Sequence, residues 1–264
     1  MKLETCPLCG ESAFTSFLQI DHRYIVKCVK CTHIFASEYS EEELKRIYLK
    51  DYYSSSDDPR ITDWIQKNKS VWNGLVKTLH HYINPNSLCD IGAGTGGFLI
   101  THKELYPNTV LYAVESSEEV VGFLKAKISN LNIITSSADT IKKVSLTFDA
   151  VTMFQTLEHL KDPRSVILNI YEKINKSGVL FLTVPNVNSY MVKLKKDKYC
   201  FQNSTHLHFF SYHNLKKFLL EIGFKNVIRV IQWGGSDVSG LKKIPQYCFR
   251  YLGISTELRV IAFK

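Results

Sequence analysis

The sequence predicts an α/β fold in which a doubly wound sheet follows a small cysteine-rich unit. Residues 88–98 read as the end of a buried strand, a tight glycine turn and the start of a helix. Apolar, β-branched segments follow at 108–114, 132–139, 148–155 and 178–186, as expected for further strands. Ahead of them, four of the seven cysteines are gathered close to the N-terminus.

The length and composition agree with this fold class. The chain has 264 residues, enough for one α/β domain with a large core and a small appendage. Its apolar content of 45% and aromatic content of 12% are typical of globular proteins. We expect no membrane span, because no run of eighteen apolar residues occurs. No hydrophobic signal region follows Met1, so we expect a cytoplasmic protein.

The clustered cysteines form two C-x-x-C pairs that are separated by eighteen residues. They are Cys6, Cys9, Cys28 and Cys31. This spacing indicates a structural zinc site, and its four ligands leave no open position for catalysis. Two disulfides are the alternative, but the cytoplasm keeps thiols reduced. We assign residues 1–37 to a zinc ribbon; His33 could replace one ligand, but we expect it at the surface.

Residues 38–84 are expected to form a helical bridge or lid between the ribbon and the core, which covers residues 85–264. Ser40 and Glu43 make a capping box that predicts a short helix. Apolar residues then recur at helical spacing over Ile61–Tyr82. An Asn-Pro-Asn sequence ends that helix before the first strand of the core.

The glycine turn can serve either of two classes of nucleoside cofactor. Gly92, Gly94 and Gly97 match G-x-G-x-x-G, which alone is a weak sign of a dinucleotide site. The alternative spacing G-x-G-x-G runs from Gly92 to Gly96, and Asp90 lies two positions before it. A carboxylate so close would repel a pyrophosphate but attract the ammonium and sulfonium of S-adenosylmethionine. Asp90 therefore favours S-adenosylmethionine.

Two further acidic residues suit the other parts of a nucleoside. Glu115 ends the second expected strand, about twenty positions after the glycines, where a Rossmann-type sheet holds a ribose by its hydroxyls. Both cofactor classes contain a ribose, so Glu115 indicates a nucleoside without identifying it. Asp139 ends the third segment and could bind an adenine amino group; a solvated or helix-capping aspartate is the alternative.

From about residue 65 to 264 the chain resembles the class I S-adenosylmethionine-dependent methyltransferases. The glycine loop, the two later acids and the turn after the fourth strand fall in that family's order and spacing. The resemblance implies a Rossmann-like sheet of seven strands with an antiparallel last strand, and the β-rich segments 224–233 and 257–263 fit this. It also implies that Phe154 and Gln155 contact the cofactor beside the sulfonium.

The ribbon, Glu158–His159 and the segment His206–Leu215 together resemble a narrower group. These are ribbon-bearing methyltransferases that act on sugars, often nucleotide-linked, in surface-polysaccharide or antibiotic pathways. The resemblance implies O-methylation of a sugar or of another nucleotide-linked or phosphorylated small metabolite, for example in capsule or other surface-glycan biosynthesis. An anionic small-molecule acceptor agrees with the formal net charge of +8.

A hydroxyl acceptor must lose its proton during methyl transfer, and histidine suits that task. Three candidates lie where the substrate is expected: His159 after the fourth strand, and His206 and His208 farther along the chain. We predict His206 as the general base, with His159 as its rival. A hydrogen-bonded structural histidine is the alternative for each.

Glu158 and His159, followed later by His206, also resemble part of a divalent-metal site that some class I relatives have. Those relatives carry E-x-x-E-H, and this chain has Gln155 in place of the first carboxylate. The replacement removes a charge from such a site and weakens the metal interpretation. Glu158 remains a candidate catalytic residue beside the histidines.

RNA is the second class of acceptor, because positive charge attracts it and some ribosomal-RNA methyltransferases carry a zinc knuckle. Against RNA, the basic residues are scattered, and arginine, the commonest specific base reader, is scarce. The third hypothesis is a ribbon protein that keeps the cofactor fold without catalysis. The intact glycines, Asp90 and Glu115 speak against it. The sequence determines neither the acceptor nor the oligomeric state.

Overall fold

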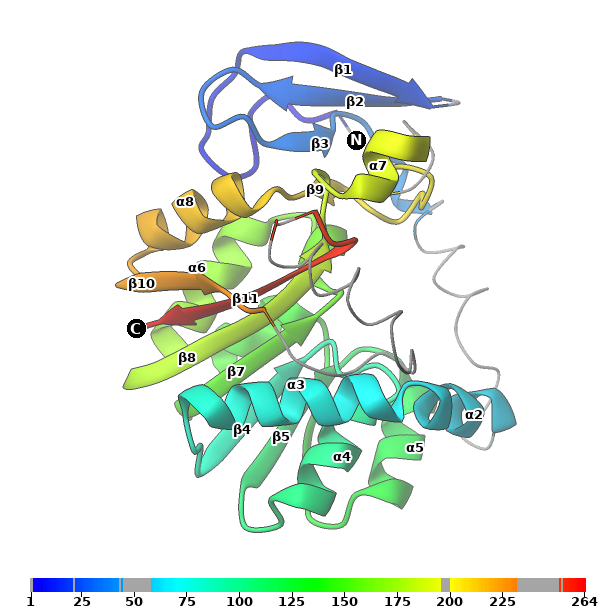
Figure 1. The fold of residues 1–264 in the computed structure, drawn as a ribbon, viewed down its shortest axis with the longest axis vertical. Coiled ribbons are helices and arrows are strands. Elements are labelled where there is room, and N and C mark those ends of the chain that lie inside the picture. The colour runs from blue at the N-terminus through cyan, green and yellow to red at the C-terminus, as the bar shows by residue number, and fades with distance from the viewer. Residues whose placement is uncertain are drawn as a thin grey trace.

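The computed structural model describes residues 2–20, 22–42, 44, 58–195, 200–231, 252 and 254–264. Within them the chain builds a small N-terminal sheet and a seven-stranded sheet with helices on both faces (Figure 1). The short helix expected from the capping box at Ser40 and Glu43 lies largely outside the described residues. No helix in the described segments is long and apolar enough to cross a membrane.

Seven strands build the central sheet. They are β4 (Ser87–Ile91), β5 (Val110–Glu115), β6 (Asn132–Thr135), β7 (Phe148–Phe154), β8 (Ile174–Pro185), β10 (Asn226–Arg229) and β11 (Glu257–Phe263). Their order is β10-β11-β8-β7-β4-β5-β6. Neighbours among β4–β8 pair in parallel, whereas β11 is antiparallel to both β8 and β10. This confirms the seven-stranded sheet with an inserted antiparallel last strand.

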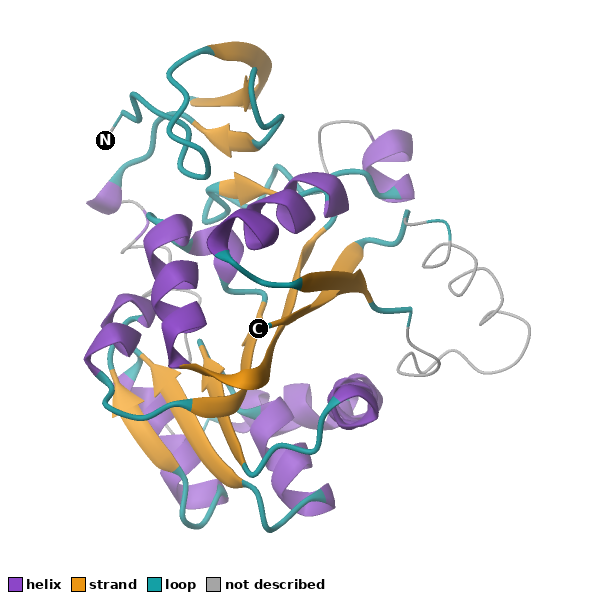
Figure 2. Cartoon of the chain, turned by 90° about the vertical axis from the view of Figure 1, so that its left-hand side faces the viewer, coloured by secondary structure: helices purple, strands orange, loops and turns teal. Residues whose placement is uncertain are grey.

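Helices bury both faces of the central sheet (Figures 1 and 2). One face packs against α6 (Pro163–Lys173) and α8 (Tyr212–Ile222), and the other against α3 (Lys69–Tyr82), α4 (Gly97–Leu105) and α5 (Glu118–Lys127). On β4, Cys89 and Ile91 belong to the first of these cores and Leu88 to the second. A strand reverses its side chains at every residue, so an uninterrupted apolar run is a strand buried on both faces.

The helices that follow the strands begin at defined caps. Ser117 begins α5 and Ser211 begins α8, and each side chain accepts a first-turn backbone N–H. Asp162 caps α6 in the same way, and Pro163 takes its first position. These caps satisfy N–H groups that a helix leaves unpaired, and they fix where each loop ends beside the sheet.

The helix expected over Ile61–Tyr82 is interrupted at Asn68, which separates α2 (Pro59–Lys67) from α3. Asn68 has φ −104° and ψ 11°, and its side-chain amide donates to the carbonyl of Trp64 at 2.8 Å. Asparagine competes in this way with the hydrogen bonds of a helix. The apolar periodicity continues across the break, so the pattern alone predicts one helix.

The third strand of the core is shorter than the sequence predicts. β6 ends at Thr135, and the chain then forms a 3-10 helix, η1 (Ala138–Lys143). Asp139 lies in the first turn of η1, where the partial positive charge of a helix N-terminus favours a carboxylate. The segment 132–139 is therefore a strand only in its first half.

The N-terminal sheet has four strands in the order β1-β2-β3-β9. They are β1 (Phe14–Ile20), β2 (Arg23–Cys28), β3 (Ile34–Ala36) and β9 (His208–Phe209). β9 comes from far along the chain and pairs antiparallel with β3, so that Phe35 lies opposite His208. The N–H of Ala36 also donates to the carbonyl of Leu207 at 2.9 Å. A segment of the C-terminal half thus completes the sheet of the ribbon.

The ribbon and the central sheet also share one buried cluster. Leu8 and Phe35 of the ribbon lie in the same apolar cluster as Val184 of β8 and Phe210 beyond β9. Arg164 of α6 donates to the carbonyl of Leu8. Since a unit as small as the ribbon buries little surface by itself, this shared burial contributes to holding it in place.

Gly96→Ala should destabilise the fold more than Gly10→Ala. Both glycines have positive φ, 70° and 73°, so either substitution introduces strain of about 1–2 kcal/mol. A Cβ on Gly96 would lie 2.0 Å from Cδ2 of Leu124, whereas a Cβ on Gly10 would meet nothing within 4 Å. The clash should add about 1–3 kcal/mol at Gly96. Urea denaturation measures both losses; equal losses would show that Leu124 moves aside freely.

Candidate functional site

A cleft of about 780 Å³ opens at the carboxyl ends of β4, β5, β6 and β7. The strand order reverses between β4 and β7, and open α/β sheets bind their ligands at such a point. Gly92, Gly94 and the segments 114–119, 136–138, 154–156 and 159–160 line the cleft. Its volume is within the range of small-molecule and cofactor sites.

The loop after β4 exposes its backbone to this cleft. Gly92 and Gly94 have φ values of 70° and 52°. A Cβ on Gly92 would lie 2.5 Å from Oγ1 of Thr156, so this position has no room for a side chain. A Cβ on Gly94 would meet only a backbone oxygen at 4.0 Å. The open space at Gly94 lets a ligand approach the main chain closely.

Gly96, which the sequence predicts as a cofactor residue, is buried behind the loop and does not line the described cleft. Its N–H donates to the carbonyl of Ala93 at 2.9 Å, and its missing side chain makes room for Leu124. In this structure Gly96 closes the turn and begins α4.

Glu115 ends β5 and lies in the cleft against the glycine loop. Its Oε2 accepts the N–H of Gly94 at 2.8 Å, and its Oε1 accepts the N–H groups of Ser116 and Ser117 at 2.7 and 2.9 Å. These bonds hold the carboxylate at the edge of the cleft. A carboxylate has about four lone-pair positions, so Glu115 can also accept hydrogen bonds from a ribose.

Asp90 lies beneath the glycine loop and is only 2% exposed. It is not among the described residues that line the cleft. Its Oδ1 accepts a hydrogen bond from Oγ1 of Thr152 at 2.7 Å. Burial raises the pKa of Asp90 to about 7; the Thr152 hydrogen bond opposes this shift and the charge of Glu115 adds to it. Asp90 thus lies beneath the loop and contributes no side chain to the described lining of the cleft.

Asp139 is exposed on η1 and also lies outside the described lining. Its neighbours Ser137 and Ala138 do line the cleft, next to the end of β6. A nucleoside base placed in this part of the cleft would therefore meet residues 136–138 before it met the carboxylate of Asp139.

Phe154 and Gln155 line the cleft at the end of β7. Gln155 has φ 51°, a left-handed conformation that is uncommon outside glycine. Its side-chain amide donates to Oγ1 of Thr183 at 3.2 Å and to Oε2 of Glu257 at 3.0 Å. These bonds hold the strained turn in place, and strain of this kind clusters at functional sites.

Of the three candidate histidines, only His159 lies in the described lining of the cleft. Its Nδ1 is 3.0 Å from the carbonyl oxygen of Thr205 and must donate to it. In the neutral ring the lone pair is therefore on Nε2. Burial lowers the pKa of His159 below 6.5, and the bond to Thr205 partly offsets this. The ring is thus neutral at pH 7, as a general base must be.

His206 is buried, and both of its ring nitrogens have partners. Nδ1 lies 3.3 Å from the carbonyl oxygen of Cys200, and Nε2 lies 3.1 Å from Nδ2 of Asn203. Burial lowers the pKa of His206 to about 3, and the neighbouring His159 adds to the shift. This arrangement leaves His206 no nitrogen with which to accept a substrate proton, so the geometry does not favour it as the base.

His208 lies on β9, away from the cleft. Its Nε2 donates to the carbonyl of Leu160 at 2.8 Å, so its Nδ1 accepts from Nε2 of His33 at 3.1 Å. Burial lowers the pKa of His208 to about 4. The expectation that His33 lies at the surface is wrong, because its ring is fully buried against Phe35 and Phe210. The histidine pair joins the ribbon to the core.

Glu158 is fully buried, and neither of its carboxylate oxygens has a hydrogen-bond partner in the described part of the chain. Burial raises its pKa to about 8, and the charge of Glu257 adds to the shift. At neutral pH this side chain is therefore mostly uncharged. Its Oε1 lies 3.9 Å from Nε2 of His159.

The ligand atoms of Glu158, His159 and His206 lie within 4.8 Å of one another. They occupy the positions of the divalent-metal site weighed from the sequence. The residues do not fit a metal ion well, because His206 is engaged at both nitrogens and Gln155 is turned toward Thr183. Two ligands are too few for a divalent site held by protein alone.

The described lining of the cleft is acidic. It contains Glu115, Glu118 and Glu119, and none of the described lining residues is a lysine or an arginine. A cationic ligand is favoured here and an anionic one is disfavoured. The positive net charge is therefore carried elsewhere on the molecule and gives the cleft itself no anion site among the described residues.

Sequence reasoning missed three contributors to the site. The carbonyl of Thr205 orients His159, and that of Leu160 orients His208. Every residue has a carbonyl, so no sequence pattern could have selected these two. Thr156, which packs against Gly92, follows directly after Gln155 and could have been found from the turn after the fourth strand.

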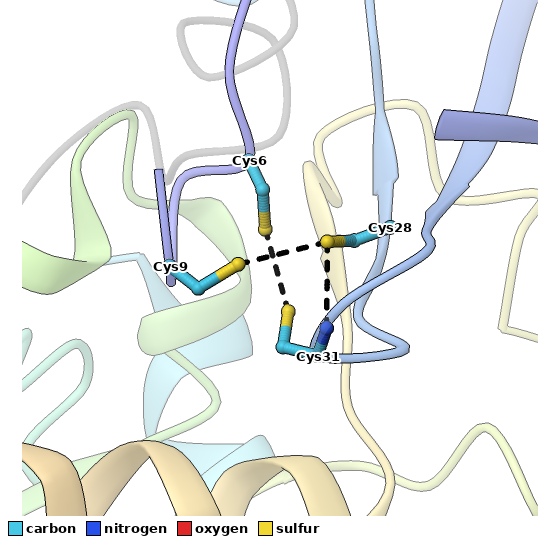
Figure 3. Close-up of side chains that lie close together, drawn as sticks. All are labelled: Cys6, Cys9, Cys28 and Cys31. Carbon is cyan, nitrogen blue, oxygen red and sulfur yellow. Dashed lines mark hydrogen bonds between the residues drawn. The ribbon is translucent and has the colours of Figure 1, made fainter. Parts of the chain in front are cut away.

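The four ribbon cysteines converge from two turns (Figure 3). Sγ atoms are 3.5 Å apart in the pair Cys6–Cys31 and 3.6 Å apart in the pair Cys9–Cys28. Four thiolates at about 2.3 Å from a zinc ion lie about 3.8 Å from one another, so the group has the size of a tetrahedral site. The separations are too long for disulfides, which have S–S bonds of about 2.05 Å.

Comparisons with known sequences agree with this geometry. A sequence profile described as a methyltransferase domain matches residues 65–228. A ubiquinone biosynthesis O-methyltransferase of Coxiella burnetii is 27% identical over 150 residues, covering 49% of this chain and 64% of the relative. A malonyl-[acyl-carrier protein] O-methyltransferase of Bacillus anthracis is 24% identical over 120 residues, covering 44% of each chain. The chain thus matches less than two thirds of the length of these curated relatives.

Solved structures share the fold. A SAM-dependent methyltransferase from Thermotoga maritima superposes with a TM-score of 0.55 at 17% identity, covering 84% of this chain and 98% of that one. The plantazolicin methyltransferase BamL, solved with SAH and a triazolic desmethylPZN analog, gives a TM-score of 0.59 at 15% identity, covering 85% and 97%. At these identities the likeness shows the fold.

Asp90→Asn should stabilise the protein at pH 8 and have a smaller effect at pH 5. Folded Asp90 keeps its proton up to a pKa of about 7, whereas the unfolded residue loses it near 3.8. Between these values the unfolded state binds fewer protons, so stability falls as the pH rises. Asparagine keeps an acceptor for Thr152 without a charge, which removes a loss of about 1.4 kcal/mol per unit of pKa difference. Urea unfolding at both pH values checks this; a pH-independent change would contradict it.

Proposed function

Because the chain belongs to the methyltransferase-domain family, we propose that it transfers a methyl group from S-adenosylmethionine to a hydroxyl oxygen of a small molecule, with His159 as the general base. One observation carries the proposal: His159 lies in the lining of the cleft, close to the turn after β7, and its bond from Nδ1 to Thr205 makes Nε2 the proton-accepting nitrogen of the neutral ring. Two curated relatives are named O-methyltransferases, which supports oxygen as the acceptor atom.

The lining residues fit S-adenosylmethionine. Glu115 suits the ribose hydroxyls, residues 136–138 suit the adenine, and the open backbone at Gly94 suits the amino-acid part. The acidic lining suits the ammonium and the sulfonium. When bound, S-adenosylmethionine supplies a methyl carbon that its sulfonium has already activated. The task left to the protein is to align the acceptor and to remove its proton.

With S-adenosylmethionine bound, Nε2 of His159 would accept the proton of the acceptor hydroxyl as its oxygen bonds to the methyl carbon and the carbon–sulfur bond breaks, with the neutral thioether as the leaving group. The carbonyl of Thr205 holds the opposite nitrogen and stabilises the imidazolium that forms. Glu158 lies 3.9 Å from Nε2. A positive charge on His159 would lower the pKa of this buried carboxyl and so be favoured by its presence. Glu158 thus supports the base without touching the acceptor.

His159 thus takes the place of His206, which the sequence favoured as the general base. His206 is the residue predicted first, yet both of its nitrogens have partners and it lies outside the described lining of the cleft. His159 meets the geometric requirement for a base, and geometry is the first condition for that role.

For the acceptor we propose a sugar hydroxyl of a nucleotide-linked or phosphorylated metabolite in surface-glycan biosynthesis, the class that the ribbon-bearing resemblance implies. The net charge of +8 supports attraction of such an anion to the protein as a whole. The acidic lining disfavours a phosphate within the cleft, so in this proposal the sugar end of the acceptor lies beside His159. The same acidic lining gives no support to RNA as the acceptor.

We also propose that the four ribbon cysteines hold one structural zinc ion. Their Sγ atoms lie within 4.8 Å of one another, and four thiolates complete a tetrahedral site. Thiol ligands need a reducing compartment, which supports a cytoplasmic location.

His159→Gln should lower turnover by about 10²–10⁴-fold, because the acceptor loses its base. The affinity for S-adenosylmethionine should stay unchanged. Transfer of labelled methyl groups to a panel of nucleotide-sugars, phosphorylated sugars, phenols, carboxylic acids and bulk RNA measures turnover, and calorimetry measures cofactor affinity. For the wild type, kcat/KM should rise with pH to a plateau through a midpoint below 6.5, in line with the lowered pKa of His159.

His80→Gln is the matched control, because His80 is a partly exposed histidine on α3 that does not line the cleft. It should keep wild-type turnover. Full turnover in His159→Gln would remove His159 from the base role. No binding of S-adenosylmethionine by the wild type would instead favour a ribbon protein without catalysis.

Removal of zinc should loosen the ribbon and leave the central sheet folded. Metal analysis should find one zinc ion per chain. After treatment with a chelator, amide hydrogen exchange should accelerate in β1–β3 and in β9, which pairs with β3, while β4 and β7 stay protected. Restoring zinc should restore protection. Simultaneous loss of protection in β4 and β7 would show that ribbon and core unfold as one unit.

A further inference from the structure

We infer that Arg23 is a positioning residue for His159, so that the N-terminal ribbon takes part in orienting the general base. Arg23 begins β2 and reaches the 200–206 loop, the segment that runs into β9. That loop contains Thr205, whose carbonyl accepts from Nδ1 of His159. The inference rests on the proposed function only in taking His159 as the base.

One guanidinium group holds three carbonyls of the 200–206 loop. Nη1 of Arg23 donates to Phe201 at 3.2 Å and to Asn203 at 3.0 Å, and Nη2 donates to His206 at 2.6 Å. The planar fork of arginine presents its donors in fixed directions, so the three carbonyls are held in one arrangement. Hydrogen bonds from a charged donor are shorter and stronger than those between neutral groups.

Hydrogen bonds within the loop fix the position of Thr205 relative to the carbonyls that Arg23 holds. Oδ1 of Asn203 accepts from the backbone N–H of Thr205 at 3.0 Å and from its hydroxyl at 2.7 Å. The N–H of His206 donates to the carbonyl of Asn203 at 3.1 Å. The peptide between Thr205 and His206 is therefore held on both sides, and its carbonyl is left pointing at His159.

The carbonyl of Thr205 decides which nitrogen of His159 can act. While it accepts from Nδ1, the neutral ring must carry its lone pair on Nε2, the nitrogen that takes the proton in the proposed function. If the loop moves, Nδ1 loses its acceptor, and the neutral ring can take its proton on Nε2 instead. That tautomer cannot accept a proton at Nε2.

Apolar contacts attach the same loop to the ribbon. Cys200 and Phe201 pack in one buried cluster with Ile25 of β2, and Phe17 of β1 lies 5.7 Å from the Phe201 ring. β2 begins at Arg23 and ends at Cys28, one of the four clustered thiols. The strand thus connects the cysteine cluster to the loop that orients His159.

The test measures the tautomer of His159 and needs no acceptor. Full-length, zinc-loaded protein is labelled with ¹⁵N-histidine, and long-range ¹H–¹⁵N spectra report which nitrogen of each neutral ring carries the proton; the missing signal in His159→Gln assigns His159. The wild type should show one tautomer, protonated at Nδ1. Arg23→Gln should show a mixture that includes the Nε2-protonated form and a lowered pKa of His159, because the charged ring loses the carbonyl of Thr205. In Arg23→Lys the fraction of His159 that is protonated at Nε2 should lie between the wild-type and Arg23→Gln values.

Arg164→Gln is the matched control. Arg164 also donates across the contact between ribbon and core, to the carbonyl of Leu8, and in the described part of the chain it makes no hydrogen bond to the 200–206 loop. It should keep the wild-type tautomer. Should Arg23→Gln fail to fold by circular dichroism, Asn203→Ala decides, since it breaks the bonds to Thr205 without touching the ribbon.

A single wild-type tautomer in folded Arg23→Gln would overturn the inference, as would an equal change in Arg164→Gln, which would indicate general loosening of the ribbon. Failure of the base proposal looks different. If His159→Gln keeps full turnover while Arg23→Gln changes the tautomer, Arg23 still positions His159, but His159 is not the base. If both proposals hold, Arg23→Gln lowers kcat and leaves the affinity for S-adenosylmethionine unchanged.

Discussion

The pairing of β9 with β3 is the interaction on which the character of this site depends. It adds two residues of the C-terminal half to the sheet of the ribbon, opposite Ile34 and Phe35. The bond between His33 and His208 fixes the pair from within. Because β9 is anchored in this way, the 200–206 loop before it has a defined course past His159. β9 is only two residues long and depends on its pairing with β3 for stability, yet it helps to set the position of the His159 side chain, which lies on another element.

Buried acidic side chains are the second feature that distinguishes the site. Asp90 under the glycine loop and Glu158 beside His159 are both almost fully enclosed, and burial raises the pKa of each toward or above neutrality. Glu115 differs, because backbone N–H groups satisfy it at the edge of the cleft. A cationic ligand in this cleft would relieve the cost of the buried acids. The acidic groups in and beneath the cleft therefore favour a cationic ligand.

Much of the fold and the cofactor side of the site was accessible from local pattern. The places of Gly94 and Glu115 in the site could be predicted from a strand, the glycine turn after it and the end of the next strand, because each of these motifs is formed by residues close together in the sequence. Asp139 shows the limit: its place in the sequence suits an adenine contact, yet β6 ends early and η1 turns its carboxylate outward. The histidines show it more clearly, because the choice between His159 and His206 depends on bonds to Thr205 and Asn203 that no spacing encodes.

Local patterns in the chain were enough to predict the α/β class, the glycine loop with its acids and the two cysteine pairs, because periodicity, turn chemistry and ligand spacing are properties of residues close together in the sequence. Three other features became visible only in the folded molecule: the buried cluster shared by the ribbon and the central sheet, the burial of His33, and the reach of Arg23 to the 200–206 loop. These contacts join segments far apart in the chain. Their partners are backbone carbonyls and enclosed rings, which become specific only when folding brings them together.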